Sequence, residues 1–90
     1  MAINYTIVVD DKLVVVNGVA KVPVEFTLYD PEIRAVQWMG EYGYIEFKTQ
    51  VIDGQRYKPE NEYFYDATKF QDAITAWENW VDPDPRKEQL

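Results

Sequence analysis

Apolar and polar residues alternate along the first part of the chain. The run from residue 3 to residue 9 places an apolar side chain at every second position, and this period of two predicts a half-buried β-strand. A β-branched run at 12–16 ends at Asn17-Gly18. Asn-Gly between apolar runs favours a type I′ hairpin turn, because both central positions of that turn need positive φ. The sequence therefore predicts an N-terminal β-hairpin.

The next segment predicts an edge strand and one helical turn. Apolar residues alternate again over 22–28, which predicts the return strand of the hairpin. Pro23 cannot donate to a ladder, so this strand is expected at a sheet edge or with a bulge. Asp30 followed by Pro31 resembles an N-cap and first helical position. We therefore expect one helical turn through Arg34.

Two further hairpins are predicted in the middle of the chain. Their turns are expected at 40–43 and at Asp53-Gly54, a dipeptide that also favours a primed turn. The corresponding strands are predicted at 35–38, 44–48, 50–52 and 55–57.

One amphipathic helix is predicted after these strands. Asp66 can serve as its N-cap, and Pro83 is expected to stop it. Its apolar face is formed by Phe70, Ala73, Ile74, Trp77 and Val81. Strands followed by one helix predict an α+β fold, in which an antiparallel β-sheet of hairpins carries the C-terminal helix packed across one face. We expect a single small domain over residues 1–82 and a Pro-rich tail over 83–90.

Three residue types are absent from the chain, which limits the catalytic and metal-binding chemistry that it can support. The 90 residues contain no His, no Cys and no Ser, which excludes disulfides, Cys/His zinc sites, Ser and Cys nucleophiles and an imidazole base. Carboxylates remain, but Glu25, Glu46, Asp53 and the Asp10-Asp11 pair are expected to be solvated strand and turn residues. No segment fits a calcium-binding loop, and no apolar run is long enough to cross a membrane. We expect no enzyme, no cofactor and no metal.

Acidic residues are concentrated in the C-terminal third. The chain carries a net charge of −7, and residues 59–84 hold seven acids against one base. Such a field repels phosphate backbones, so direct nucleic-acid binding is disfavoured. The same charge allows an alternative, in which a nucleic-acid mimic presents carboxylates to a basic groove. The residues assigned to this surface are Glu62, Asp66, Asp72 and Glu78.

Aromatic side chains suggest protein contacts. Aromatic residues are enriched in the centres of protein–protein interfaces. Trp80 lies beside the apolar stripe of the predicted helix rather than on it, so it is expected to be exposed. The predicted interface set is Tyr42, Tyr63, Tyr65 and Trp80, together with the edge strand near Pro23.

Residues 30–80 also resemble a pattern of small bacteriophage proteins from tail or tail-fibre regions. The first part of the pattern is Pro-x-Ile-x-Ala-Val-Gln-Trp at 31–38, followed by Gly-x-Ile-Glu-Phe at 43–47. The second part is Pro59, Asn61-Glu62, Phe70-Gln71 and Ala76-Trp77-Glu78. This chain departs from the pattern by having more residues between Phe47 and Pro59. The resemblance implies a setting and supplies no catalytic residue.

These observations together lead to one expectation about function. A non-enzymatic bacteriophage protein acting by protein–protein interaction is expected, as a small tail or tail-fibre structural component or a fibre-assembly chaperone. Its partners would be other phage tail or fibre proteins or a host protein, with no direct nucleic acid and no membrane; a homo-oligomer is a further alternative. The expected place is the host cytoplasm during infection, or the virion. The competing hypothesis is an acidic inhibitor of a host defence or nucleic-acid-processing enzyme.

Overall fold

A six-stranded antiparallel sheet forms the centre of the molecule. The computed structural model describes residues 3–82, and the predicted Pro-rich tail lies outside them. The spatial order of the sheet is β3 (Val19–Lys21), β2 (Leu13–Val16), β1 (Tyr5–Val8), β4 (Ile33–Trp38), β5 (Gly43–Phe47) and β8 (Glu62–Phe64). A separate two-stranded ladder pairs β6 (Gln50–Ile52) with β7 (Gln55–Tyr57). A 3₁₀ turn, η1 (Ala67–Phe70), leads into α1 (Gln71–Glu78). The predicted α+β fold is confirmed.

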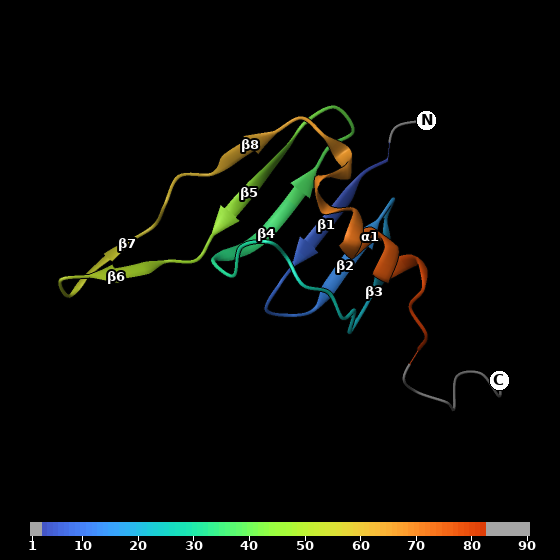
Figure 1. The fold of residues 1–90 in the computed structure, drawn as a ribbon, viewed down its shortest axis with the longest axis horizontal. Helices are drawn as coiled ribbons and strands as arrows, with labels where there is room; N and C mark the ends of the chain where they lie inside the picture. Colours follow the sequence, from blue (N-terminus) through green and yellow to red (C-terminus); the bar gives the residue numbers. More distant parts are fainter. Residues whose placement is uncertain (1–2, 83–90) are drawn as a thin grey trace.

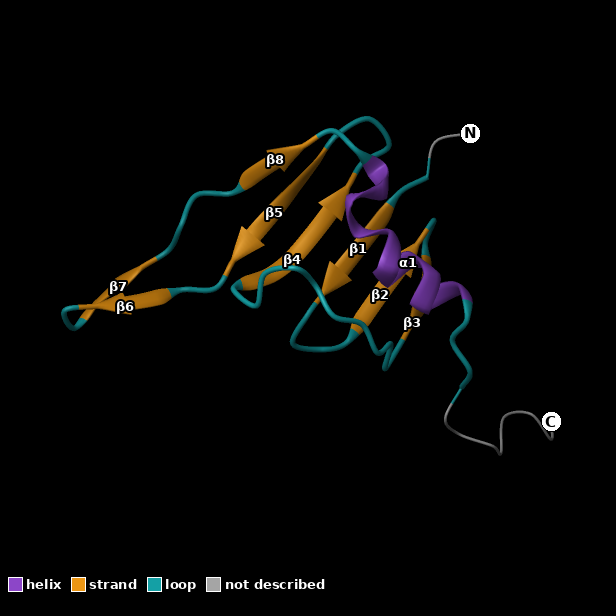
Figure 2. Ribbon diagram, in the orientation of Figure 1, coloured by secondary structure: helices purple, strands orange, loops and turns teal. Residues whose placement is uncertain are grey.

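The helix covers one face of the sheet, which is where the core lies. Figures 1 and 2 show η1 and α1 crossing the face of the sheet over β1, β2 and β3. The predicted alternation along the strands places every second residue in this layer. The buried sheet residues are Tyr5, Ile7, Val14, Val16, Ile33, Val36, Trp38, Ile45 and Phe64, and Phe70, Ala73 and Ile74 come from η1 and α1.

Both predicted primed turns are present. Asn17 and Gly18 have φ angles of 49° and 83°, and Asp53 and Gly54 have φ angles of 51° and 78°. Positive φ at both central positions is the geometry of a type I′ turn, whose twist matches that of the flanking strands. Local chemistry alone therefore determines the chain reversals at these two places.

The segment that follows β3 does not form the predicted strand, and it keeps the predicted burial at three of the four apolar positions, since Val22 is 51% exposed. Val24 is buried and Phe26 and Leu28 are half-buried against the core, yet residues 22–29 form no ladder. Pro23 has no N–H to donate, and its carbonyl oxygen accepts a hydrogen bond from the indole of Trp80 at 2.8 Å. The edge strand predicted over 22–28 is therefore wrong: the return strand of the hairpin is β3, which ends at Lys21.

The helical turn predicted at Asp30–Arg34 is also wrong. The Asp30 carboxylate accepts a hydrogen bond from the Glu32 N–H at 2.9 Å, and the Ile33 N–H donates to the Asp30 carbonyl oxygen at 3.3 Å. An Asp side chain that bonds the backbone two residues on closes a turn in place of a helix. Ile33 is fully buried in the first position of β4, so the strand begins where the helical turn was expected.

The predicted N-cap, Asp66, caps the 3₁₀ turn η1 that leads into α1, and α1 itself begins later and ends earlier than predicted. Asp66 accepts hydrogen bonds from the Thr68 N–H at 2.9 Å and the Thr68 hydroxyl at 2.7 Å, and these bonds lower the pKa of the Asp66 carboxyl. The helix ends at Glu78, before the predicted stop at Pro83. Val81 is therefore exposed instead of completing the apolar face. Beyond the helix the chain turns so that the indole of Trp80 reaches the loop after β3.

A long hairpin with an open middle extends beyond the sheet. β5 pairs with β8, and β6 pairs with β7, in one continuous register. Between the two ladders, residues 46–49 and 58–61 lie opposite each other without pairing. Pro59 has no N–H to donate there, and the Lys48 N–H instead donates to the Glu32 carbonyl oxygen at 2.8 Å. We call residues 50–57 the arm; it projects away from the sheet in Figure 1.

Gly43 allows two aromatic rings to meet, and these rings connect the sheet to the helix. Gly43 is paired with Trp38 on β4 and with Phe64 on β8. The rings of Trp38 and Phe64 meet with centroids 5.2 Å apart, and Phe64 meets Phe70 edge-to-face at 5.2 Å. A Cβ placed on Gly43 would lie 2.7 Å from the Phe64 ring and closer still to the Gln37 carbonyl oxygen. The position therefore requires glycine.

Tyr5 makes the second link between the sheet and the helix. Its hydroxyl donates to the Ala67 carbonyl oxygen at 3.1 Å, and its ring stacks on Trp38 with centroids 6.2 Å apart. Burial raises the pKa of the Tyr5 phenol well above its usual range, and the nearby Asp66 carboxylate raises it further. The folded protein therefore stabilises the neutral phenol.

The first prediction concerns Gly43. We expect Gly43→Ala to lower the free energy of unfolding by about 1–3 kcal/mol, because the added methyl group must displace backbone or a packed ring. Urea denaturation followed by tryptophan fluorescence measures the change. Gly54→Ala is the control, since a Cβ at Gly54 meets nothing within 4 Å and only the positive φ is strained. A Gly43→Ala protein as stable as the wild type would contradict the packing described here.

The second prediction concerns alkaline pH. Because the pKa of Tyr5 is raised in the folded state, its contribution is fully present below the usual value of 10.0 and is lost as the pH rises above it. Tyr5→Phe should cost about 1 kcal/mol at neutral pH, through the lost hydrogen bond to Ala67. In denaturant titrations, the gap between the two proteins should stay constant up to about pH 9 and narrow as the pH rises from about 10 to about 11.5. A gap that stays constant over this range would contradict the assignment.

Candidate functional site

The sheet face opposite the helix presents a band of polar and aromatic side chains. The register pairs Thr6 with Gln37, Gln37 with Tyr44, and Tyr44 with Tyr63, so these four residues form one row across β1, β4, β5 and β8. Thr6, Gln37 and Tyr44 are half-buried, and Tyr63 is exposed. Within residues 3–82, both η1 and α1 lie on the other side of the sheet. We call this surface the open face.

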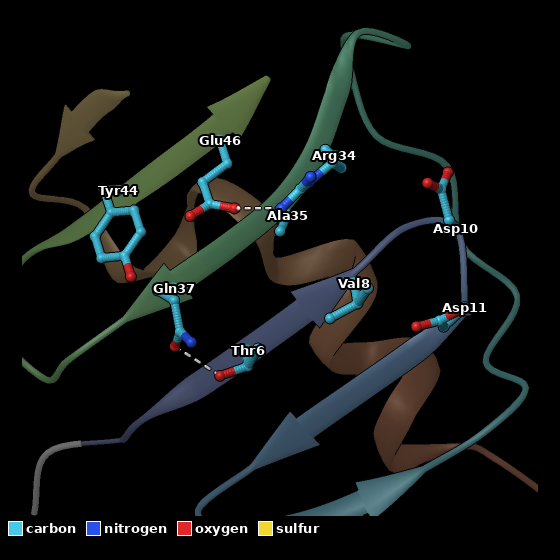
Figure 3. Close-up of a pocket in the computed structure, with 9 residues that line it drawn as sticks. All are labelled: Thr6, Val8, Asp10, Asp11, Arg34, Ala35, Gln37, Tyr44 and Glu46. Atoms are coloured by element: carbon cyan, nitrogen blue, oxygen red, sulfur yellow. Dashed lines mark hydrogen bonds and ion pairs between the residues drawn. The ribbon is translucent and has the colours of Figure 1, made fainter. Parts of the chain in front are cut away.

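A shallow pocket of about 390 Å³ lies on the open face. Figure 3 shows the side chains of Asp10, Asp11 and Glu46 around it, with Val8 and Ala35 between them. Asp10 and Asp11 come from the β1–β2 turn, whereas Glu46 comes from β5 on the other side of β4. Residues far apart in the sequence thus place three carboxylates around one apolar floor. We call this the acidic pocket.

Two polar contacts organise the walls of the acidic pocket. The Arg34 guanidinium lies 3.3 Å from a carboxylate oxygen of Glu46, and the Thr6 hydroxyl donates to the amide oxygen of Gln37 at 2.6 Å. The second bond leaves the Gln37 amide nitrogen available to donate. Among residues 3–82, neither the Asp10 nor the Asp11 carboxylate has an ion-pair partner. The pocket therefore offers carboxylates and an amide donor to an incoming cationic or polar group.

The acidic pocket is poorly suited to acid–base catalysis. A carboxyl group that acts as a general acid near neutral pH needs an environment that disfavours its ionised form. Asp10 and Asp11 are accessible to water, and Glu46 faces the cationic Arg34. None of the three carboxyl groups has the apolar burial on which a general acid of this kind depends.

Neither a metal site nor a membrane span is found in the described part of the chain. Over residues 3–82, no group of three or more metal-ligating side chains is arranged to hold an ion. The helix of this segment is too short to traverse a bilayer.

Three tyrosines gather at one end of the open face. The rings of Tyr42 and Tyr63 have centroids 6.4 Å apart, and those of Tyr44 and Tyr63 lie 6.3 Å apart. Tyr42 is 42% exposed and Tyr63 58% exposed, while the nearby Tyr65 is 76% exposed. Tyr42, Tyr63 and Tyr65 are thus the accessible rings that the sequence predicted. Tyr44 was missed, although it lies two residues after Tyr42, and alternate positions of an extended chain share a face. We call Tyr42, Tyr44 and Tyr63 the tyrosine cluster.

Trp80 occupies a different position from the one predicted. It is half-buried against the core, and its indole N–H donates to the Pro23 carbonyl oxygen at 2.8 Å. The Trp77 indole N–H likewise donates to the Val19 carbonyl oxygen of β3 at 2.9 Å. Lys21 lies 3.9 Å from the centre of the Trp77 ring and donates to the Trp77 carbonyl oxygen. Trp80 was expected to be exposed, but it therefore packs against the segment after β3, whereas Val22 and Pro23 of that segment are exposed.

The four acidic residues predicted as an interface do not act as one group. Asp66 is engaged as the N-cap of η1. Asp72 and Glu78 are exposed but lie six positions apart on α1, so they point to different sides of the helix. Glu62 is exposed on β8. The carboxylates that the structure does bring together, Asp10, Asp11 and Glu46, were expected to be ordinary solvated residues, because sequence spacing does not reveal cross-strand neighbours.

Comparison with known proteins gave no match: no family model, no curated protein and no solved structure is similar to this chain.

A prediction follows from the tryptophan contacts. Trp80→Phe keeps an aromatic ring but loses the N–H that bonds the Pro23 carbonyl, so it should lower the free energy of unfolding by about 1 kcal/mol. Urea denaturation monitored by far-UV circular dichroism measures this. Tyr65→Phe, which alters an exposed hydroxyl, is the control and should change stability by less than about 0.5 kcal/mol. Equal stability of Trp80→Phe and the control would show that the indole contact contributes nothing.

Proposed function

We propose that this protein is a non-catalytic protein-binding module that contacts its partner through the tyrosine cluster. The observation that carries the proposal is the exposure of Tyr42 and Tyr63, whose rings lie together at one end of the open face. Tyrosine rings provide a large amphipathic contact area with few rotatable bonds, so little conformational entropy is lost when they are buried. Such rings are enriched among the residues that dominate binding energy at protein interfaces.

The position of the cluster also favours a protein partner. Tyr44 and Tyr63 sit on adjacent strands of a sheet, so their backbone positions are held by the ladder of β5 and β8. A rigid aromatic surface needs little reorganisation on binding. The exposed Tyr65 follows β8 directly and extends the surface toward the helix. The contact area proposed here therefore joins the tyrosine cluster to Tyr65.

The absence of His, Cys and Ser from the chain supports a non-enzymatic role. The remaining candidates for acid–base chemistry are carboxylates, and those of the acidic pocket are accessible to water or face a cation. A recognition function uses such groups without requiring proton transfer.

The proposed setting comes from the resemblance of residues 30–80 to phage tail-region proteins. In that setting the protein is a small tail or tail-fibre component, or a chaperone of fibre assembly. Its partners are then other phage tail or fibre proteins, or a host protein. It works in the host cytoplasm during infection or in the virion.

The binding proposal predicts a specific loss on mutation. Affinity-tagged protein expressed during phage infection should capture a tail or fibre protein, identified by mass spectrometry. The double variant Tyr42→Ala/Tyr63→Ala should reduce this capture by about tenfold or more, since interface hot spots each contribute about 2 kcal/mol. Val81→Ala, which alters an exposed side chain just beyond the end of the helix, is the matched control.

Two results would contradict the proposal. One is capture that the double variant leaves unchanged while circular dichroism shows the same fold. The other is a partner that is a nucleic-acid-processing enzyme and is released by salt and by reversing the charge of Asp72 and Glu78. That pattern would support the acidic inhibitor instead, because electrostatic mimicry weakens steeply as ions screen the charges.

A further inference from the structure

The arm carries exposed apolar side chains far from the core. Val51 is 68% exposed, and Ile52 and Tyr57 are each more than half exposed. A two-stranded hairpin standing alone in water is marginally stable at best. The arm nevertheless has a type I′ turn and continues the register of β5 and β8. An ordered hairpin with an apolar surface and no packing of its own is suited to docking on another surface.

The arm and the residues that flank it carry a net positive charge, whereas the rest of the described chain carries a net negative charge. Residues 48–58 contain three cations and one acid, whereas the other described residues contain four cations and thirteen acids. Each of those four cations has a partner in the structure: Lys12 and Arg34 pair with carboxylates, and Lys21 and Lys69 lie over aromatic rings. Within residues 3–82, the three cations without an ion-pair or ring partner are Lys48, Arg56 and Lys58.

One face of the arm combines positive charge with an apolar group. Val51 and Arg56 are directly opposite each other in the β6–β7 ladder, so their side chains share a face. Lys58 lies two residues beyond Arg56, just outside the ladder, and adds a second cation at this end of the arm. The other face bears Ile52 and Tyr57. The Val51 and Arg56 face therefore presents one apolar side chain beside a cation, and Lys58 supplies the second cation at the same end of the arm.

The acidic pocket has the complementary arrangement. Its floor is formed by Val8 and Ala35, and the unpaired carboxylates of Asp10 and Asp11 lie at its edge. Its volume of about 390 Å³ accommodates one or two side chains of a docking strand. The pocket cannot be filled by the arm of the same chain, because the arm extends away from the sheet (Figure 1).

We propose that the arm of one copy docks in the acidic pocket of a second copy, with Arg56 and Lys58 facing Asp10 and Asp11 and with Val51 over Val8 and Ala35. Opposite charges meet at this contact, and apolar surface that is exposed in the single chain becomes buried. When each copy gives its arm and receives the other, a two-fold axis relates the two contacts and the assembly closes as a dimer. This inference is independent of the proposed function, since it uses neither Tyr42 nor Tyr63.

Charge reversal on each side of the contact tests the proposal. In sedimentation equilibrium at low salt, the wild type should associate, and Arg56→Glu and Asp11→Arg should each raise the dimer dissociation constant by about tenfold or more. In an equimolar mixture of the two variants, the altered arm of one protein meets the altered pocket of the other, and the unaltered arm meets the unaltered pocket. Opposite charges then face each other at both contacts, so the mixture should associate more tightly than either variant alone. Added salt should weaken the wild-type dimer, because it screens the charges.

The controls separate this contact from general charge effects and from the tyrosine surface. Lys69→Glu changes the net charge by the same amount as Arg56→Glu but lies on η1, so it should leave association unchanged. Tyr42→Ala/Tyr63→Ala should also leave association unchanged. A wild type that remains monomeric up to millimolar concentration overturns the proposal. Association that Arg56→Glu does not weaken, or that the mixture does not restore, overturns it as well.

Discussion

The missing side chain at Gly43 is the constraint on which the rest of the fold depends. Because no Cβ stands between them, Trp38 and Phe64 meet across β5 and hold the short strand β8 against the sheet. Phe64 in turn contacts Phe70, the last residue before α1, so the position of the helix depends on the same contact. A three-residue edge strand has few backbone hydrogen bonds to hold it in the sheet. Aromatic packing over the glycine adds the stability that these hydrogen bonds alone do not give β8.

The two edges of the sheet avoid pairing with a further strand in different ways. At β3 the indole N–H of Trp77 binds the Val19 carbonyl oxygen, and just beyond β3 the indole N–H of Trp80 binds the Pro23 carbonyl oxygen, so tryptophan side chains lie along this edge. At the other edge the chain from β7 to β8 carries Arg56, Lys58 and Pro59, which oppose pairing with a further strand. Both devices discourage edge-to-edge association. The contacts proposed for the open face and for the arm accordingly use side chains rather than an edge strand.

The sequence predicted those features that depend on neighbouring residues. The turns at Asn17-Gly18 and Asp53-Gly54 follow from the need for positive φ, and the N-cap at Asp66 follows from its own side chain. Features that depend on distant partners were missed or misplaced. The position of the Trp80 ring depends on a hydrogen bond to the Pro23 carbonyl oxygen, 57 positions away in the sequence. The acidic pocket forms only when the sheet register brings separate strands together. Periodicity over 22–28 correctly indicated the burial of Val24, Phe26 and Leu28 but not the exposure of Val22, and burial does not require a ladder.

The shared register of the two ladders in the long hairpin restricts how the arm can vary in length. Side chains on a strand alternate between faces, so one residue added to a single strand of the hairpin would move Val51 away from Arg56 and mix the two faces of the arm. One residue added to each strand would keep the pairing but turn the cationic face to the opposite side. Only additions of two residues to both strands preserve its direction, which lengthens the arm by about 7 Å at each step. Related proteins that retain this surface should therefore have arms whose lengths differ in steps of four residues.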